Sequence, residues 1–363
     1  MKKILLFTFS ATLLFSCNTK QPDTTSLEAS VEAPKTPKNI ILLIGDGTGL
    51  SQMSASQFYN ENSSNFERFP VVGLLKTSAS DALITDSAAS GTAYASGIKT
   101  YNGAIGVDQD SVPVPTIVEQ ISKFGYSTGV IATSSINHAT PAAFYAHATS
   151  RRDYSDIAAF LPTSDIDFFA GGGRRFFNQR TDERNLLDEL AENSFTVDTV
   201  ALPTTSTGKQ AFILAEAAMP TMLEGRGDFL PNATALALQN LSQNEKGFFI
   251  MIEASQVDWG GHGNDADYLI AELLDFDKTI GVALDFALQN EDTLVLVTAD
   301  HETGGFTLSS DGDDYNKIKP SFSTTGHSAT MVPILAFGPG AELFGGISEN
   351  TSVYDKMMSL LSE

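Results

Sequence analysis

Three apolar runs of this chain each lead directly into acidic or imidazole side chains. The runs are Ile40–Ile44, Phe248–Ile252 and Leu294–Val297. A continuous apolar run of this length is typical of a strand that is buried on both faces of a parallel sheet. Because parallel strands end at one edge of an open α/β sheet, we expect the side chains that follow the three runs to share one crevice.

The residues that follow these runs have the chemistry of metal ligands. They are Asp46, Glu253, Asp258, His262, Asp300 and His301. Two further histidines lie in similar polar clusters, namely His138 and His327. Carboxylate and neutral imidazole together suit zinc, whereas sets made only of oxygen ligands suit magnesium. The sequence therefore predicts a metal centre.

Each piece, taken alone, also has a simpler interpretation. A strand followed by Asp46 and glycine is typical of a plain turn. Asp258 and His262 are four residues apart, but the glycines between them weaken a helix and fit a surface loop as well as a metal site. Asp300 fits a helix cap. The coincidence of all three at strand ends favours the metal site.

The segment Ile84–Gly97 predicts the start of a helix with Asp86 near its N-cap, followed by small residues that allow close backbone approach. A serine in the first turn faces unpaired N–H groups and the positive end of the helix dipole, which favours an alkoxide and an anionic substrate. Ser87 is the best placed nucleophile. Without the metals, the simpler interpretation is that Ser87 and Ser90 are ordinary small residues of a packed helix.

Eight segments of the chain together resemble the bacterial alkaline phosphatases, in that family's order and from about Asn39 to the end of the chain. They are Ile44–Gly47, Thr85–Ser90, Gly97–Asp108, His138–Pro141, His147–Arg151, Glu253–His262, Thr298–His301 and Gly326–His327. The joint match is highly specific. It implies an alkaline phosphatase, which is a hydrolase that acts on phosphate monoesters.

The resemblance also implies a set of metal sites, with two Zn²⁺ and one Mg²⁺ per subunit. The ligands that match the first zinc are Asp258, His262 and His327. Those that match the second zinc are Asp46, Asp300 and His301. Those that match the third site, usually magnesium, are Asp46, Thr140 and Glu253.

The implied mechanism is in-line attack by Ser87 on phosphorus, followed by hydrolysis of the phosphoserine and release of an alcohol and inorganic phosphate. Arg151 matches the guanidinium that binds the phosphate, for which a planar bidentate donor is apt. His147, one helical turn before Arg151, has no catalytic role in the family pattern, and we expect it to be structural.

Two residues depart from one branch of the family. His138 stands where some bacterial relatives have an aspartate near the third metal, and Trp259 stands where they have a lysine. Both are expected beside the substrate or the metal ligands. A tryptophan offers one neutral N–H donor in place of a flexible cation, so it predicts weaker retention of phosphate. The alternative is that Trp259 only packs the wall of the site.

The N-terminus resembles a bacterial lipoprotein signal. Met1–Lys3 is followed by an apolar run to Phe15 and by Cys17 within a lipobox-like segment. The run is too short for a transmembrane helix and fits a signal peptide, residues 1–17, that ends at a lipidated Cys17. An ordinary signal with an incidental cysteine is the alternative. Residues 18–38, rich in Thr, Pro, Ser and Glu, predict a disordered tether.

Charge excludes one class of partner. The chain carries 44 acidic and 22 basic side chains, a formal net charge of −22, which argues against a nucleic-acid-binding surface. We expect small phosphomonoesters as partners and contact with a membrane only through the lipid anchor. The expected location is the periplasm or the cell surface. A homodimer is expected on resemblance alone.

The pattern of strands and helices predicts the fold class. Further strand-like runs lie at Thr128–Ala132 and Pro333–Phe337, and a long helical stretch covers Asp265–Leu288. Alternation of this kind indicates a three-layer α/β/α sandwich with a largely parallel central sheet, here a catalytic domain over residues 39–363. The segment Asp167–Pro231 is less periodic and is interpreted as a surface excursion, a small inserted cap over the site.

Two rival functions remain at this point. A phosphodiesterase or sulfatase of the same superfamily is the first, but the sulfatase motif is absent and diesterases usually lack the third-metal residues Thr140 and Glu253. A non-catalytic lipoprotein that captures phosphate or zinc is the second. It would not need a nucleophile at a helix start, and loss of Ser87 would leave its ligand uptake intact.

Overall fold

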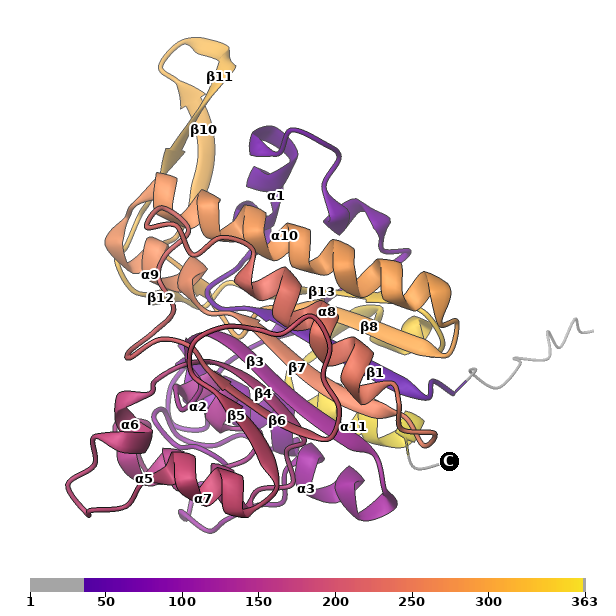
Figure 1. Ribbon diagram of the computed structural model, residues 1–363. Helices are drawn as coiled ribbons and strands as arrows, with labels where there is room; N and C mark the ends of the chain where they lie inside the picture. Colours follow the sequence, from indigo (N-terminus) through magenta and orange to yellow (C-terminus); the bar gives the residue numbers. More distant parts are fainter. Residues whose placement is uncertain (1–35, 362–363) are drawn as a thin grey trace, which may run out of the picture. The chain divides into compact units, whose positions relative to one another are not determined.

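A central sheet of ten strands organises the protein, whose computed structural model describes residues 36–361 (Figure 1). In spatial order the strands are β14 (Gly346–Glu349), β2 (Val71–Lys76), β13 (Val332–Phe337), β8 (Thr293–Thr298), β1 (Asn39–Gly45), β7 (Phe248–Ala254), β3 (Ser127–Ser135), β4 (Phe168–Gly172), β6 (Lys209–Ile213) and β5 (Phe195–Asp198). Only β13 runs antiparallel to its neighbours, so the sheet is largely parallel, as predicted. All five predicted strands are present.

Alternate residues of the central strands face two separate cores, which explains why these strands are apolar throughout. Ile40, Leu42 and Ile44 of β1 join one buried cluster, and Ile41 and Leu43 join the other. Helices cover both faces, so the sandwich has the three predicted layers. On the first face lie α2 (Ser87–Ser96), α3 (Ile117–Ile121), α7 (Leu186–Glu192) and α11 (Thr351–Leu361); on the second lie α1 (Leu50–Tyr59), α8 (Phe229–Leu241) and α10 (Ala266–Gln289).

The interpretation of Asp167–Pro231 as a surface excursion is wrong. This segment supplies β4, β6 and β5, which extend the central sheet beyond β3 in parallel. Two short helices, α5 (Tyr154–Ala158) and α6 (Arg175–Asn178), lie before and within it. The three strands lack the continuous apolar pattern that identified the other strands. β4 contains two glycines, β5 spans four residues and β6 begins with Lys209 and Gln210.

Gly260 and Gly261 lie inside α9 (Gln256–Gly263), a helix that the sequence left in doubt. A Cβ atom on Gly260 would lie 2.6 Å from the backbone nitrogen of Leu269 in α10. A side chain there would therefore push α9 and α10 apart. The glycine that lowers the helix propensity is required by close packing between the two helices.

A hairpin separates two of the predicted metal ligands in sequence and leaves them adjacent in space. β10 (Thr307–Asp311) and β11 (Asp314–Ser321) form an antiparallel arm that protrudes from the body (Figure 1). At its base, β9 (Glu302–Thr303) pairs with β12 (His327–Ser328), with His327 opposite Thr303. The pairing places His327 beside His301.

The signal peptide, Cys17 and most of the predicted tether lie outside the described residues. The catalytic domain is ordered from its predicted start, since Lys38 already donates a backbone hydrogen bond to Asp292 and β1 begins at Asn39. Within residues 36–361, no helix has the length and apolarity that a membrane crossing requires.

Candidate active site

The predicted ligands meet at the carboxyl ends of four adjacent strands, β8, β1, β7 and β3. Asp46 follows β1, Glu253 is the penultimate residue of β7, and Asp300 and His301 follow β8. His138 and Thr140 follow β3 at α4 (Ala139–Ala142). Parallel pairing sets Ile44 beside both Glu253 and Thr298, so the strands end level with one another. The side chains that the sequence predicted to gather at one edge of the sheet therefore do so.

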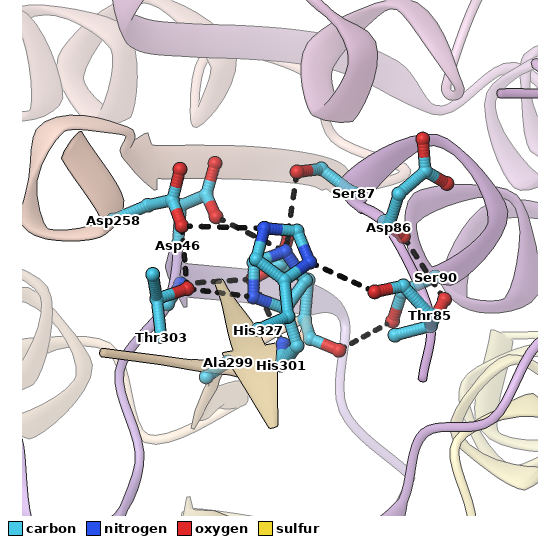
Figure 2. Close-up of polar contacts among 12 residues, drawn as sticks. Asp46, Thr85, Asp86, Ser87, Ser90, Asp258, Ala299, His301, Thr303 and His327 are labelled. Atoms are coloured by element: carbon cyan, nitrogen blue, oxygen red, sulfur yellow. Dashed lines mark hydrogen bonds and ion pairs between the residues drawn. The ribbon is translucent and has the colours of Figure 1, made fainter. Parts of the chain in front are cut away.

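Three groups of side chains at this edge could each hold a metal ion, and within each group the ligand atoms lie within 4.8 Å of one another. The groups are Asp258, His262 and His327; Asp46, Asp300 and His301; and Asp46, His138 and Glu253. Figure 2 shows Asp46, Asp258, His301 and His327 converging from their separate elements. Asp46 belongs to two of the groups, so each of its carboxylate oxygens can serve a different ion.

In the first group, Asp258, His262 and His327, hydrogen bonds orient both imidazole rings so that their Nε2 atoms point toward one another. His262 Nε2 lies 3.3 Å from Asp258 Oδ2 and 3.2 Å from His327 Nε2. The opposite nitrogens face backbone carbonyls, His262 Nδ1 at 2.6 Å from Thr325 O and His327 Nδ1 at 2.8 Å from Thr85 O. A carbonyl only accepts, so both Nδ1 atoms carry the proton and both Nε2 atoms are free to bind a metal.

The second group is fully buried. His301 Nε2 lies 3.2 Å from Asp300 Oδ2 and 3.6 Å from Asp46 Oδ1. Asp300 Oδ1 accepts from the backbone of Gly47 at 3.1 Å and of His301 at 2.9 Å. Asp300 is not a helix cap, because the element that follows it is the strand β9. The His301 and His327 rings stack with centroids 3.5 Å apart, which links this group to the first.

Several atoms of the second and third groups are buried and have no hydrogen-bond partner among the described residues. They are Asp46 Oδ1 and Oδ2, Glu253 Oε1, Asp300 Oδ2, His138 Nδ1 and Thr140 Oγ1. A buried carboxylate oxygen without a partner costs several kcal/mol of folding free energy, roughly, unless a cation compensates it. The donor set thus fits metal ions better than it fits a protein without them.

Burial also shifts the pKa values of Asp46, Glu253 and His138. Burial, and next the charge of Asp300, raises the pKa of Asp46 well above its usual range. Burial raises the pKa of Glu253 to about 7 against the hydrogen bond from Ser255. Burial, and next the charge of Arg151, lowers the pKa of His138 to about 4. Both carboxyl shifts show that burial disfavours the charged form of these two side chains.

Ser87 is the first residue of α2, as the sequence predicts, and Asp86 is its N-cap, with Oδ1 accepting from Ala89 N at 3.0 Å. The Ser87 hydroxyl lies 3.3 Å from His301 Nε2, on the side of the ring that faces the second group (Figure 2). Arg151 Nη1 donates to Asp86 Oδ2 at 2.9 Å. Among the described residues this is the only side-chain hydrogen bond of Arg151, so its other donors are available to an anion.

Two residues contribute contacts that sequence reasoning did not assign. Asn102 accepts from Asp86 N at 2.7 Å and donates to Ile84 O at 3.0 Å, which holds the turn before Ser87. Thr303 contacts both Asp258 and His301. Asn102 lies inside the segment Gly97–Asp108 that carries the family resemblance, and Thr303 comes two residues after His301. Those positions were the only sequence signals for the two residues.

Trp259 and His147 occupy different surroundings. Trp259 is half-buried and meets His138 edge to face, with ring centroids 6.0 Å apart. It therefore lies against the third group. This position is consistent with both alternatives from the sequence, namely packing in the wall of the site and contact with the substrate. His147 Nδ1 lies 2.6 Å from Gly106 O and Nε2 lies 2.9 Å from Glu119 Oε1, and it belongs to none of the three metal-ligand groups.

Comparison with known proteins agrees with the geometry. A protein-family model described as alkaline phosphatase matches residues 37–321. The chain belongs to the alkaline phosphatase family. It is accordingly a metal-dependent phosphomonoesterase, the function that the sequence predicted. The interpretations as a sulfatase, a diesterase or a non-catalytic capture protein are set aside.

Individual relatives of this alkaline phosphatase cover most of its length. Alkaline phosphatase 4 of Bacillus subtilis (strain 168) is 37% identical over 306 residues, which are 79% of this chain and 66% of that protein. The structure of the alkaline phosphatase from the Antarctic bacterium TAB5 matches with a TM-score of 0.89 and 51% identity, over 91% of this chain and 99% of that one. A histidine-to-aspartate mutant of the TAB5 enzyme, equally similar, is described with Mg bound in its M3 site.

The raised pKa of Glu253 predicts a pH-dependent cost in the metal-free enzyme. A carboxyl whose folded-state pKa is raised from 4.5 to about 7 stabilises the fold below the lower value and loses this contribution as the pH rises through the higher one. In the presence of a chelator, we therefore expect the Tm of Glu253→Gln, measured relative to that of the unsubstituted protein, to rise by several degrees when the pH is raised from 6 to 8. An equal Tm difference at both pH values would contradict this origin of the strain.

Proposed function

We propose that this alkaline phosphatase hydrolyses phosphate monoesters through a phosphoserine intermediate on Ser87. The observation that carries the proposal is the position of the Ser87 hydroxyl, at the start of α2 and 3.3 Å from His301 Nε2 of the second group. A serine there faces the free N–H groups of the first helical turn, which stabilise negative charge on its oxygen. Arg151 is bonded to Asp86, the residue that immediately precedes Ser87.

We assign two zinc ions to the groups of mixed carboxylate and imidazole and one magnesium ion to the third site. The first zinc is held by Asp258, His262 and His327, and the second by Asp46, Asp300 and His301. The third site uses Asp46, Thr140 and Glu253, with His138 beside them. When bound, the zinc ions supply Lewis acidity that lowers the pKa of the attacking hydroxyl and stabilises the leaving oxygen. The orphaned oxygens of Asp46, Asp300 and Glu253 support this assignment.

The chain's own groups perform the remaining steps. Arg151 binds two oxygens of the phosphate through its free guanidinium donors, while Asp86 holds the guanidinium in place. Ser87 Oγ attacks phosphorus in line with the ester bond, which breaks as the new bond forms, and the alcohol leaves with a proton. Water then attacks the phosphoserine from the vacated side, so Ser87 Oγ is regenerated and inorganic phosphate is released.

His138 and Trp259 are proposed to tune the third site and product release. His138 Nδ1 is buried and has no partner among the described residues, and its ring contacts Trp259. An imidazole is a softer ligand than a carboxylate, so the third site should hold magnesium less tightly than a site with three oxygens. Trp259 supplies no cation to the bound phosphate, and phosphate should leave correspondingly faster.

The proposed enzyme is exported and anchored as a lipoprotein through Cys17, in the periplasm or at the cell surface, with residues 18–38 as a tether. The proposed site suits small phosphomonoesters, and a homodimer is proposed from the family resemblance. The signal segment and Cys17 lie outside the described residues, so the support for the lipid anchor comes from the sequence motifs described above. The lipid anchor is the only membrane contact that the proposal includes.

Replacement of the nucleophile tests the covalent intermediate. Ser87→Ala should yield no acid-stable phosphoenzyme when the reaction with labelled substrate is quenched, and kcat should fall by about 10³-fold or more. Ser90→Ala is the matched control, because Ser90 lies one turn along the same helix and donates to the backbone oxygen of Asp300. Labelled phosphate should still be recovered in the control. Label on Ser90 or Thr85 of the unsubstituted enzyme would refute the assignment.

His138→Asp tests the third site. A third carboxylate beside Asp46 and Glu253 adds negative charge and an oxygen ligand, so the variant should bind Mg²⁺ about tenfold or more tightly, read from magnesium titration of the zinc-loaded protein. The magnesium-bound TAB5 mutant with a histidine-to-aspartate change motivates the choice of aspartate. His138→Asn, which adds no charge, is the control. Unchanged magnesium affinity in the aspartate variant would place the magnesium ion elsewhere.

A further inference from the structure

We propose that Thr303 is a positioning residue that holds one ligand of each zinc site at once, a role that rests on the zinc assignment above. Thr303 is fully buried between the two groups (Figure 2). Its hydroxyl donates to Asp258 Oδ1 of the first group and lies 3.1 Å from His301 Nδ1 of the second. Among the described residues the hydroxyl has no other hydrogen-bond partner.

The number of protons available determines the direction of both hydrogen bonds. A threonine hydroxyl has one proton to donate, whereas an ionised carboxylate only accepts. The proton of Thr303 must therefore point to Asp258. At His301 the hydroxyl can then only accept, so the proton of the imidazole is on Nδ1.

This tautomer leaves Nε2 of His301 free to bind a metal ion. In the neutral imidazole that binds a metal, Nε2 carries no proton and faces Asp300 Oδ2, Asp46 Oδ1 and the Ser87 hydroxyl. Asp300 and Asp46 are the other proposed ligands of the second zinc, and Ser87 is the proposed nucleophile. His262 and His327 reach the same tautomer through backbone carbonyls, whereas His301 depends on a side chain that is also bonded to the other site.

The backbone of Thr303 is held in place independently of its hydroxyl. Its N–H donates to Gly47 O at 3.1 Å, and its carbonyl accepts from Gln52 Nε2 at 2.9 Å. A Cβ atom on Gly47, which has a φ of 71°, would lie 2.8 Å from Thr303 Oγ1 and 2.7 Å from Asp258 Cα. Glycine at position 47 thus permits the close approach. Removal of the hydroxyl alone should leave this framework standing.

Thr303→Val removes the hydroxyl at nearly constant shape, and Thr303→Ser restores it. We expect zinc titration of the metal-stripped protein, in competition with a chromogenic chelator, to show both zinc affinities lowered about tenfold or more in the valine variant, the usual cost of losing a partner behind a metal ligand. The serine variant should stay within about threefold of the unsubstituted protein. Thr128→Val is the matched control, since Thr128 is buried at the opposite end of β3 and its hydroxyl donates to Asp165 O, away from the metal-ligand groups.

The outcomes separate the role of Thr303 from the zinc assignment. Fewer than two zinc ions bound by the unsubstituted protein would refute the assignment itself. Two zinc ions bound normally, with neither or only one affinity lowered in Thr303→Val, would refute the role of Thr303, as would a serine variant that behaves like the valine variant.

A spectroscopic measurement on the unsubstituted enzyme covers the case in which Thr303→Val does not fold. The zinc-loaded protein labelled with ¹⁵N-histidine should show the proton of His301 on Nδ1, protected from exchange, with Nε2 bound to metal. A proton on Nε2 would overturn the proposal. The stacked arrangement of His301 on His327 identifies the two resonances through their mutual contacts.

Discussion

Four buried carboxylates at one edge of a sheet are the constraint on which the rest of this structure depends. Asp46, Glu253, Asp258 and Asp300 lie at or just after the ends of adjacent strands, and each of them is at most 5% exposed. Like charges at such distances in a medium of low dielectric constant repel one another strongly. Burial, and after it the charge of Asp300, raises the pKa values of Asp46 and Glu253. Divalent cations relieve the repulsion, and the same cations provide the chemistry of a phosphomonoesterase.

The fold supplies the rigidity that such a site needs. Parallel strands end level with one another, so ligands from distant parts of the chain meet without long loops. Each imidazole ligand has its second nitrogen bonded to a fixed acceptor, a carbonyl for His262 and His327 and a hydroxyl for His301. Ser87 is held in turn by the Asp86 cap and by Asn102. The proposed metal ligands and the proposed nucleophile are therefore held in place by the protein's own hydrogen bonds.

Much of this could be predicted from the sequence, for identifiable reasons. Continuous apolar runs predicted the five strands and the edge where the ligands gather, and the small residues after Asp86 predicted the helix that begins at Ser87. The strands β4, β5 and β6 escaped because short and glycine-containing strands lack a periodic signal. Gly260 weakened a helix that tertiary packing requires. Thr303 escaped because one threonine hydroxyl carries no pattern until the fold places it between Asp258 and His301.

Anomalous diffraction from crystals of the purified enzyme, collected on either side of the zinc absorption edge, tests the central claim most directly. The account predicts two zinc peaks, one bound by Asp258, His262 and His327 and the other by Asp46, Asp300 and His301. It also predicts a third density without zinc anomalous signal beside Glu253 and Thr140. A single zinc peak, or peaks bound by other residues, would contradict the claim that these buried carboxylates exist to hold a pair of zinc ions.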